Sequence, residues 1–110
     1  MRSSRDVANG DFDGYASDPS LLVMASLAGG PKHGHAMLND IEAMCGRRLG
    51  PGTLYGAIGR LERQGLIEPL PIDDRRQPYR LTPAGHGAFA AKLEAMRRIV
   101  AVGTERLARP

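Results

Sequence analysis

The alternation of hydrophobic and polar positions predicts three short helices, a pair of strands and a long final helix. Residues 19–28 are apolar on nearly every side, which is typical of a helix buried at the centre of a domain. Asp18 and Pro19 provide a capping carboxylate and a first-position proline at its start. Residues 34–45 are predicted to form a second, amphipathic helix, because apolar side chains recur there at three- and four-residue spacing. Its expected buried stripe is Met37 or Leu38, Ile41 and Met44.

A third helix, expected from Pro51 to Gln64, has two contrasting sides. Its core stripe consists of Leu54, Ile58 and Leu61. The opposite side and its flanks carry Gly52, Thr53, Tyr55, Gly56, Gly59, Arg60 and Arg63. Each glycine lowers helix propensity by about 1 kcal/mol relative to alanine, so we expect another surface to approach this side closely. A neighbouring helix is one alternative, but an anionic partner is favoured because arginine is seldom buried unpaired.

Two extended segments follow, at about 66–72 and 79–82, and a charged tip joins them, which is the pattern of a β-hairpin. Pro69 and Pro71 cannot donate hydrogen bonds to a neighbouring strand. The first strand must therefore be short or lie at the edge of its sheet.

The final helix, about 83–107, begins with a second cap signal at Thr82 and Pro83. It carries an apolar stripe at alternating steps of four and three residues, the spacing of a coiled-coil seam. The stripe consists of Phe89, Leu93, Met96, Val100, Gly103 and Leu107. It either packs on the core of its own chain or forms a homodimer. Dimerisation is favoured, because the preceding helices and hairpin leave little surface to cover it.

Length and composition fit one folded domain: the chain has 110 residues, 42% hydrophobic and 25% charged. Residues 1–17 are polar without a sustained period, so we expect a mobile arm there. No apolar run is long enough to span a bilayer, so a cytoplasmic protein with no membrane partner is expected. Residues 45–110 hold twelve basic and six acidic side chains, and most of the bases are arginine. The arginine fork suits phosphate and guanine, so nucleic acid is the first candidate partner.

Signals for chemistry other than binding are sparse. The candidate metal ligands, His33, His35, Cys45 and His86, have no recognised ligand spacing beyond the pair His33 and His35, so no metal site is expected. There is no acid pair, nucleophile elbow, phosphate-binding loop or dinucleotide motif. Neither an enzyme nor a cofactor is therefore expected.

Together the elements predict a mainly α, α+β architecture, namely a winged helix-turn-helix with a two-stranded β wing and a long C-terminal dimerisation helix. Four segments also carry a resemblance to the PadR family of bacterial transcriptional regulators: GPKHGH at 30–35, PGTLYGA at 51–57, LERQGLIE at 61–68 and YRLTPAG at 79–85. The predicted organisation is an N-terminal arm at 1–17, a DNA-binding domain at 18–82 and a dimerisation helix at 83–110.

The resemblance implies a homodimer that represses promoters and that, in many members, releases DNA when a small aromatic or hydrophobic compound binds. The recognition-helix motif of the family maps onto Pro51, Gly52, Thr53, Leu54, Tyr55 and Gly56, and its wing tip maps onto Arg75 and Arg76. Members generally have tyrosine where this chain has His35, and the wing here carries Pro69 and Pro71. A small-molecule effector is left open, with Met24, Phe89 and Met96 as candidates to line its pocket.

The positions of the arginines favour double-stranded DNA independently of the resemblance, because the turn before the third helix, its exposed side and the wing tip can touch one duplex together. The arginines in question are Arg47, Arg48, Arg60, Arg63, Arg75 and Arg76. The candidate DNA-binding residues are Pro51, Gly52, Thr53, Tyr55, Gly56, Arg60, Arg63, Arg75 and Arg76, and the candidate dimerisation residues are Phe89, Leu93, Met96, Val100 and Leu107. The sequence thus predicts a homodimeric repressor on a palindromic operator. The alternative is a winged-helix module that binds an acidic protein and has no DNA target.

Overall fold

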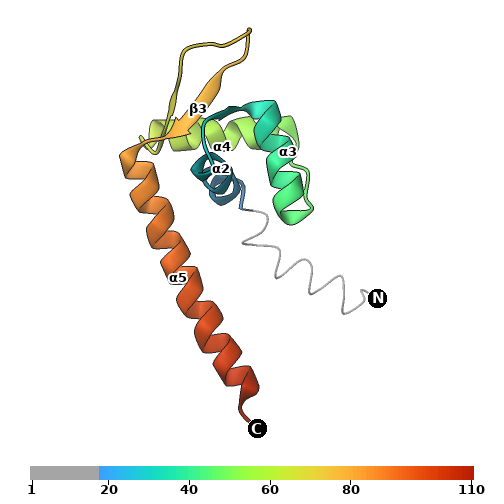
Figure 1. Ribbon diagram of the computed structural model, residues 1–110, viewed down its shortest axis with the longest axis vertical. Coiled ribbons are helices and arrows are strands. Elements are labelled where there is room, and N and C mark those ends of the chain that lie inside the picture. The colour runs from blue at the N-terminus through green and yellow to red at the C-terminus, as the bar shows by residue number, and fades with distance from the viewer. Residues whose placement is uncertain (1–17) are drawn as a thin grey trace.

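The computed structural model describes residues 18–110, so the predicted N-terminal arm lies outside the described residues. Three helices, α2 (Pro19–Ala28), α3 (Gly34–Cys45) and α4 (Pro51–Arg63), form the body of the molecule. A small sheet and the long helix α5 (Pro83–Ala108) complete the fold, and the hairpin and α5 extend from the body toward opposite ends (Figure 1). The predicted winged-helix architecture is confirmed.

The sheet has one strand more than the sequence predicts. β1 (Lys32–His33), β3 (Pro78–Leu81) and β2 (Ile67–Pro69) lie side by side in this order, and both pairings are antiparallel. β1 is only two residues long and has no apolar alternation of its own, so pairing with β3 is what makes it a strand. β2 is short and lies at the edge of the sheet, as expected from Pro69, which cannot donate to a neighbouring strand.

The starts of α2 and α5 follow the predicted cap signals. The Asp18 carboxylate accepts hydrogen bonds from the backbone N–H groups of Ser20 and Leu21 at 3.1 and 3.3 Å. The Thr82 hydroxyl oxygen accepts from the Gly85 N–H at 3.0 Å, and the same hydroxyl donates to the Gly65 carbonyl at 2.7 Å. Thr82 therefore joins the start of α5 to the turn that ends α4.

The core lies around α2, which contacts α3, α4, α5 and β3. Its side chains are Leu22, Val23, Met24 and Leu27 from α2, Met37, Leu38 and Ile41 from α3, Leu54, Ala57, Ile58 and Leu61 from α4, and Ile67 and Leu81 from the sheet. The predicted stripe of α4 is confirmed. Met24 is 6% exposed, so it belongs to this core.

The predicted stripe of α3 is wrong at its last position. Met44 is 47% exposed, whereas Cys45 packs partly buried against the core. Both positions fit the three- or four-residue spacing after Ile41, so periodicity alone does not choose between them. In the fold, the side chain of Met44 lies over an open groove beside α2 and α5 instead.

Candidate nucleic-acid interface

α4 turns a bare, positively charged side to the surface. Its apolar side is buried against α2, which leaves the opposite side outward: Gly52, Thr53, Gly56, Arg60 and Arg63 are all exposed. No ion pair is found for Arg60 or Arg63 among residues 18–110. In particular, Arg60 forms no ion pair with its near neighbour Glu62.

The glycines of this side do not serve the packing of the chain itself. A Cβ atom placed on Gly52 would meet nothing within 4 Å. On Gly56 it would meet the Arg60 Nη1 atom at 3.6 Å, and on Gly59 the Arg63 Nη1 atom at 3.3 Å. The two arginine side chains therefore lie along the glycine positions. Backbone and guanidinium groups form most of this surface, together with Thr53, and a partner can approach the helix closely at Gly52.

Tyr55 links α4 to the start of α3. Its side chain is half-exposed, and its hydroxyl lies over Gly34, the first residue of α3. A Cβ atom on Gly34 would come within 2.3 Å of the Tyr55 hydroxyl oxygen, so the tyrosine takes this position only because residue 34 is glycine. Tyr55 is not part of the core, because 54% of the residue is exposed.

The wing tip is a tight turn with two left-handed residues. Asp74 and Arg75 have φ angles of 50° and 65°, and Asp73 and Arg76 exchange both backbone hydrogen bonds at 2.9 Å. Two residues in this conformation between a bonded pair match the mirror-image turn that suits the twist of a hairpin. The turn presents Arg75 and Arg76 to solvent.

A cleft brings part of the predicted interface together. The wing tip, the start of α3 and α4 line it through His33, Gly34, His35, Tyr55, Arg75, Arg76 and Gln77. Arg60 and Arg63 lie outside the cleft, on later turns of α4. Arg48 is drawn away from the interface, because its guanidinium contacts Asn39 and Glu42 at 3.0 and 2.9 Å.

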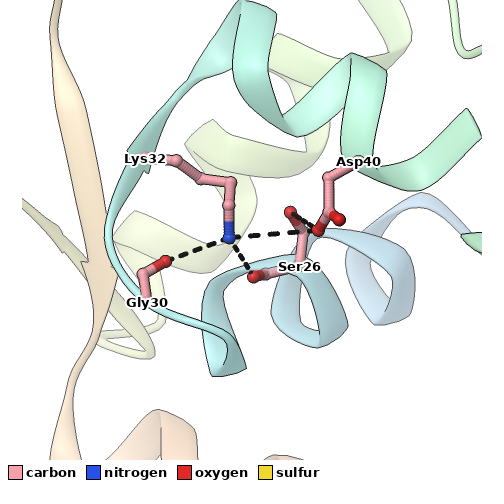
Figure 2. A network of polar contacts seen from close by, with 4 residues as sticks. All are labelled: Ser26, Gly30, Lys32 and Asp40. Atoms are coloured by element: carbon pink, nitrogen blue, oxygen red, sulfur yellow. Dashed lines mark hydrogen bonds and ion pairs between the residues drawn. The ribbon is translucent and has the colours of Figure 1, made fainter. Parts of the chain in front are cut away.

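Sequence reasoning missed the polar contacts that hold β1 in place. The Lys32 ammonium donates to the carbonyls of Ser26 and Gly30 and lies 3.9 Å from Asp40, whose carboxylate accepts from the Ser26 hydroxyl at 2.7 Å (Figure 2). Ser26 is 1% exposed, so this hydrogen bond satisfies a buried polar group. A lysine shortly after a helix end is the one sequence signal for such a contact, since lysine can bond the last carbonyls.

The base of the wing is anchored by Tyr79, which lies in the central strand and pairs with Lys32 on one side and Pro69 on the other. Burial raises the pKa of the Tyr79 phenol above its ordinary value of 10.0, and the nearby charges of Glu62 and Tyr55 raise it further. The phenol therefore stays neutral over a wider range of pH than a free tyrosine.

An apolar groove runs on the side of the molecule where α5 leaves the body. It is lined by Leu21, Leu22, Ala25, Met44, Phe89, Leu93 and Met96. Phe89 and Met96 are brought together as expected for a pocket, whereas Met24 is buried in the core and takes no part.

Most of the predicted seam on α5 lies beyond the reach of the body. Phe89 packs partly buried against the core, but Leu93, Val100 and Leu107 are 46%, 64% and 89% exposed. Packing on the chain's own core, the alternative considered above, therefore accounts only for the first turns of the helix.

Metal and membrane signals are weak in the described part of the chain. Within residues 18–110, no three His, Cys, Asp or Glu side chains lie close enough together to hold a metal ion. None of the helices described there has the length and hydropathy needed to cross a membrane.

Comparisons with known proteins agree with this geometry. The model of the transcriptional regulator PadR-like family matches residues 23–91. The chain is 37% identical over 82 residues to a transcriptional regulator of Mycobacterium tuberculosis, and the match covers 72% of this chain and 76% of that protein. It is 45% identical over 83 residues to an uncharacterized 37.1 kDa protein in a transposon of Streptomyces fradiae, which covers 76% of this chain. The match spans only 24% of that relative's length.

Among solved structures, a transcriptional regulator from Clostridium thermocellum has the same fold. The TM-score is 0.71 at 25% sequence identity, and the match covers 96% of this chain and 97% of the other.

Proposed function

This chain belongs to the PadR-like family of transcriptional regulators, and we propose that it is a repressor that binds double-stranded DNA as a homodimer on a palindromic operator. The observation that carries this proposal is the outward side of α4, where exposed glycine backbone lies beside Arg60 and Arg63. A surface of this kind accepts the phosphates and groove edges of a duplex and offers no apolar contact to a protein core.

In the proposed complex, the N-terminal turns of α4 lie deepest in the major groove. Pro51, Gly52 and Thr53 begin the helix, and Thr53 and Tyr55 are exposed where a recognition helix reaches phosphates or base edges. Arg60 and Arg63 contact the flanking backbone from the later turns. The wing arginines suit the adjacent minor groove, whose negative potential attracts arginine.

Dimerisation through α5 is the second part of the proposal. The support is the exposure of Leu93, Val100 and Leu107 on one stripe of a 26-residue helix. A two-fold pair places two recognition helices at successive major grooves, about 34 Å apart along the duplex.

A small-molecule effector is the third part. The groove lined by Phe89 and Met96 is apolar and lies between α2, α3 and α5, so a hydrophobic compound bound there would touch both the body and the dimerisation helix. Such a compound changes DNA affinity if it favours one arrangement of α5 relative to the body over another.

The test of DNA binding is a gel-shift titration against the DNA upstream of the chain's own gene. We expect the double variant Arg60→Ala with Arg63→Ala to lose binding while it keeps the oligomeric state of the parent. The matched control, Arg98→Ala with Arg106→Ala, removes two charges from α5 and should bind nearly as well as the parent. If the parent itself leaves this DNA unshifted at low salt, the protein-interaction alternative takes the place of the DNA proposal.

A further inference from the structure

His33 lies between the start of α3 and the tip of the wing and contacts both. It is the N-cap residue of α3, and its Nδ1 atom is 3.2 Å from the Ala36 backbone nitrogen. On the other side of the ring, its Nε2 atom is 3.1 Å from the Nη1 atom of Arg76. His33 also pairs with Pro78 in the sheet, so the backbone holds the ring at this place.

The two contacts both need the ring to accept a hydrogen bond, but a neutral imidazole has only one acceptor nitrogen. The Ala36 N–H and the Arg76 guanidinium can only donate, and a neutral imidazole has one acceptor nitrogen and one N–H group. With the proton on Nε2, the ring caps α3 and turns a donor toward Arg76. With the proton on Nδ1, the ring accepts from Arg76 and leaves the Ala36 N–H without its cap. Only one of the two hydrogen bonds can exist at a time.

Arg76 has a stronger acceptor available when DNA is bound. It lines the cleft between the wing tip and α4 together with Tyr55 and Arg75, on the side proposed to face the duplex. A hydrogen bond between arginine and phosphate joins two charged groups, so it is stronger than one to a neutral ring nitrogen. In the complex, Arg76 therefore bonds the phosphate in place of His33. The ring can then accept from the Ala36 N–H and cap α3.

We propose that His33 is a positioning residue of the wing, which holds Arg76 in the DNA-free protein and releases it to a backbone phosphate while the ring changes to the tautomer that caps α3. This inference rests on the proposed DNA-binding function. His33 lies outside both α4 and the wing tip, and the inference nevertheless gives it a role in DNA binding.

The first test needs no DNA. Nitrogen chemical shifts of the His33 ring, measured by NMR at mildly alkaline pH where imidazole is neutral, report which nitrogen carries the proton. We expect Arg76→Ala to raise the share of the Nε2–H tautomer, because the competing donor is gone. The neighbouring variant Arg75→Ala should leave the tautomer as in the parent. Unchanged His33 shifts in Arg76→Ala would overturn the proposal.

The second test is a double-mutant cycle with a mixed-sequence DNA duplex at low salt, since phosphate contacts need no operator. His33→Ser keeps a capping side chain for α3 but cannot reach Arg76. We expect it to raise DNA affinity about two- to five-fold, the effect of removing one competing hydrogen bond. In the Arg76→Ala background the same substitution should change nothing.

The outcomes separate the two proposals. Equal effects of His33→Ser in both backgrounds, or none in either, would overturn the role of His33. Failure of the parent protein to bind the duplex at all would overturn the proposed function. The tautomer measurement on the free protein would still decide whether His33 and Arg76 compete.

Discussion

The side chain of Tyr55 in α4 packs over Gly34 at the start of α3, where it leaves no room for a larger residue. The hydroxyl of Tyr55 occupies the place that a side chain would take, with 2.3 Å to the position of a Cβ atom. The atoms in the way are the far end of a mobile side chain, so Gly34→Ala can be accommodated if the tyrosine swings away. We predict that Gly34→Ala changes the free energy of unfolding by less than about 1 kcal/mol, since alanine also gains helix propensity.

The same substitution should weaken DNA binding several-fold, because Tyr55 leaves its place at the cleft. Urea denaturation and fluorescence anisotropy with a labelled duplex check the two halves of the prediction. The control is Tyr55→Ala: adding Gly34→Ala to it should have no further effect on affinity. Additive losses would mean that Gly34 acts through something other than Tyr55.

Tyr79 gives a prediction for alkaline pH. Its pKa is raised in the folded protein above the ordinary 10.0, so the folded state holds the phenol proton more tightly than the unfolded chain does. Its contribution to stability is complete below pH 10.0 and is lost as pH rises from there through the folded-state pKa. The free energy of unfolding should therefore fall more steeply with pH in the parent than in Tyr79→Phe. Urea denaturation on both sides of that pH checks this, and parallel curves would contradict it.

The exposure of individual side chains could be predicted where one helix side is plainly apolar, as for Leu54 and Arg60 in α4. It could not be predicted where two positions fit the period equally well, as for Met44 and Cys45. The contact of Lys32 with Ser26 has only the weak local signal of a lysine after a helix end. The contact of His33 with Arg76 joins residues through the packing of separate elements, so no local pattern signals it.

At the scale of elements, the starts of α2 and α5 follow from side-chain cap chemistry. Asp18 and Thr82 cap their helices through side-chain oxygens, and a proline follows each of them at the first helical position. These signals are local, so the sequence alone predicts the starts of α2 and α5 correctly. β1 has no such signal, because its two residues become a strand only when β3 lies beside them.

The junction between the wing and α5 depends on one glycine, and this gives a prediction with a close control. A Cβ atom on Gly85 would lie 1.9 Å from the Leu66 carbonyl oxygen, which is backbone and cannot move aside without displacing β2. We expect Gly85→Ala to lower the free energy of unfolding by about 3 kcal/mol. Gly87, two residues later in the same helix, meets nothing within 4 Å.

Gly87→Ala should raise the free energy of unfolding by about 1 kcal/mol, from helix propensity alone. The two variants differ by two positions in one helix, so thermal or urea denaturation of both isolates packing from propensity. Equal effects of the two alanines would show that Gly85 is not held against Leu66.

At the scale of the whole molecule, the candidate DNA surface and the candidate dimer surface lie at opposite ends. The wing and α5 extend away from the body in different directions (Figure 1). Substitutions on α5 therefore leave α4 and the wing tip intact. This separation lets an experiment change the number of DNA-binding units without changing the units themselves.

Val100→Asp with Leu107→Asp uses that separation. Both side chains are exposed in the single chain, so the substitutions do not disturb its core, but they place charges in the proposed seam. We expect the parent to have the mass of two chains in light scattering and the variant that of one. Ala91→Asp, on the opposite side of α5, should leave the dimer intact.

Salt dependence then tests whether the dimer is the unit that binds DNA. If a dimer neutralises about six phosphates, the logarithm of its affinity falls with the logarithm of salt concentration with a slope of about −5. A single chain makes about half of these contacts, so the slope of the Val100→Asp, Leu107→Asp variant should be about −3, with weaker affinity at every salt concentration. Anisotropy titrations at several salt concentrations measure both slopes. A variant that is monomeric yet keeps the slope of the parent would mean that one chain makes all the phosphate contacts, and that pairing through α5 serves something other than DNA binding.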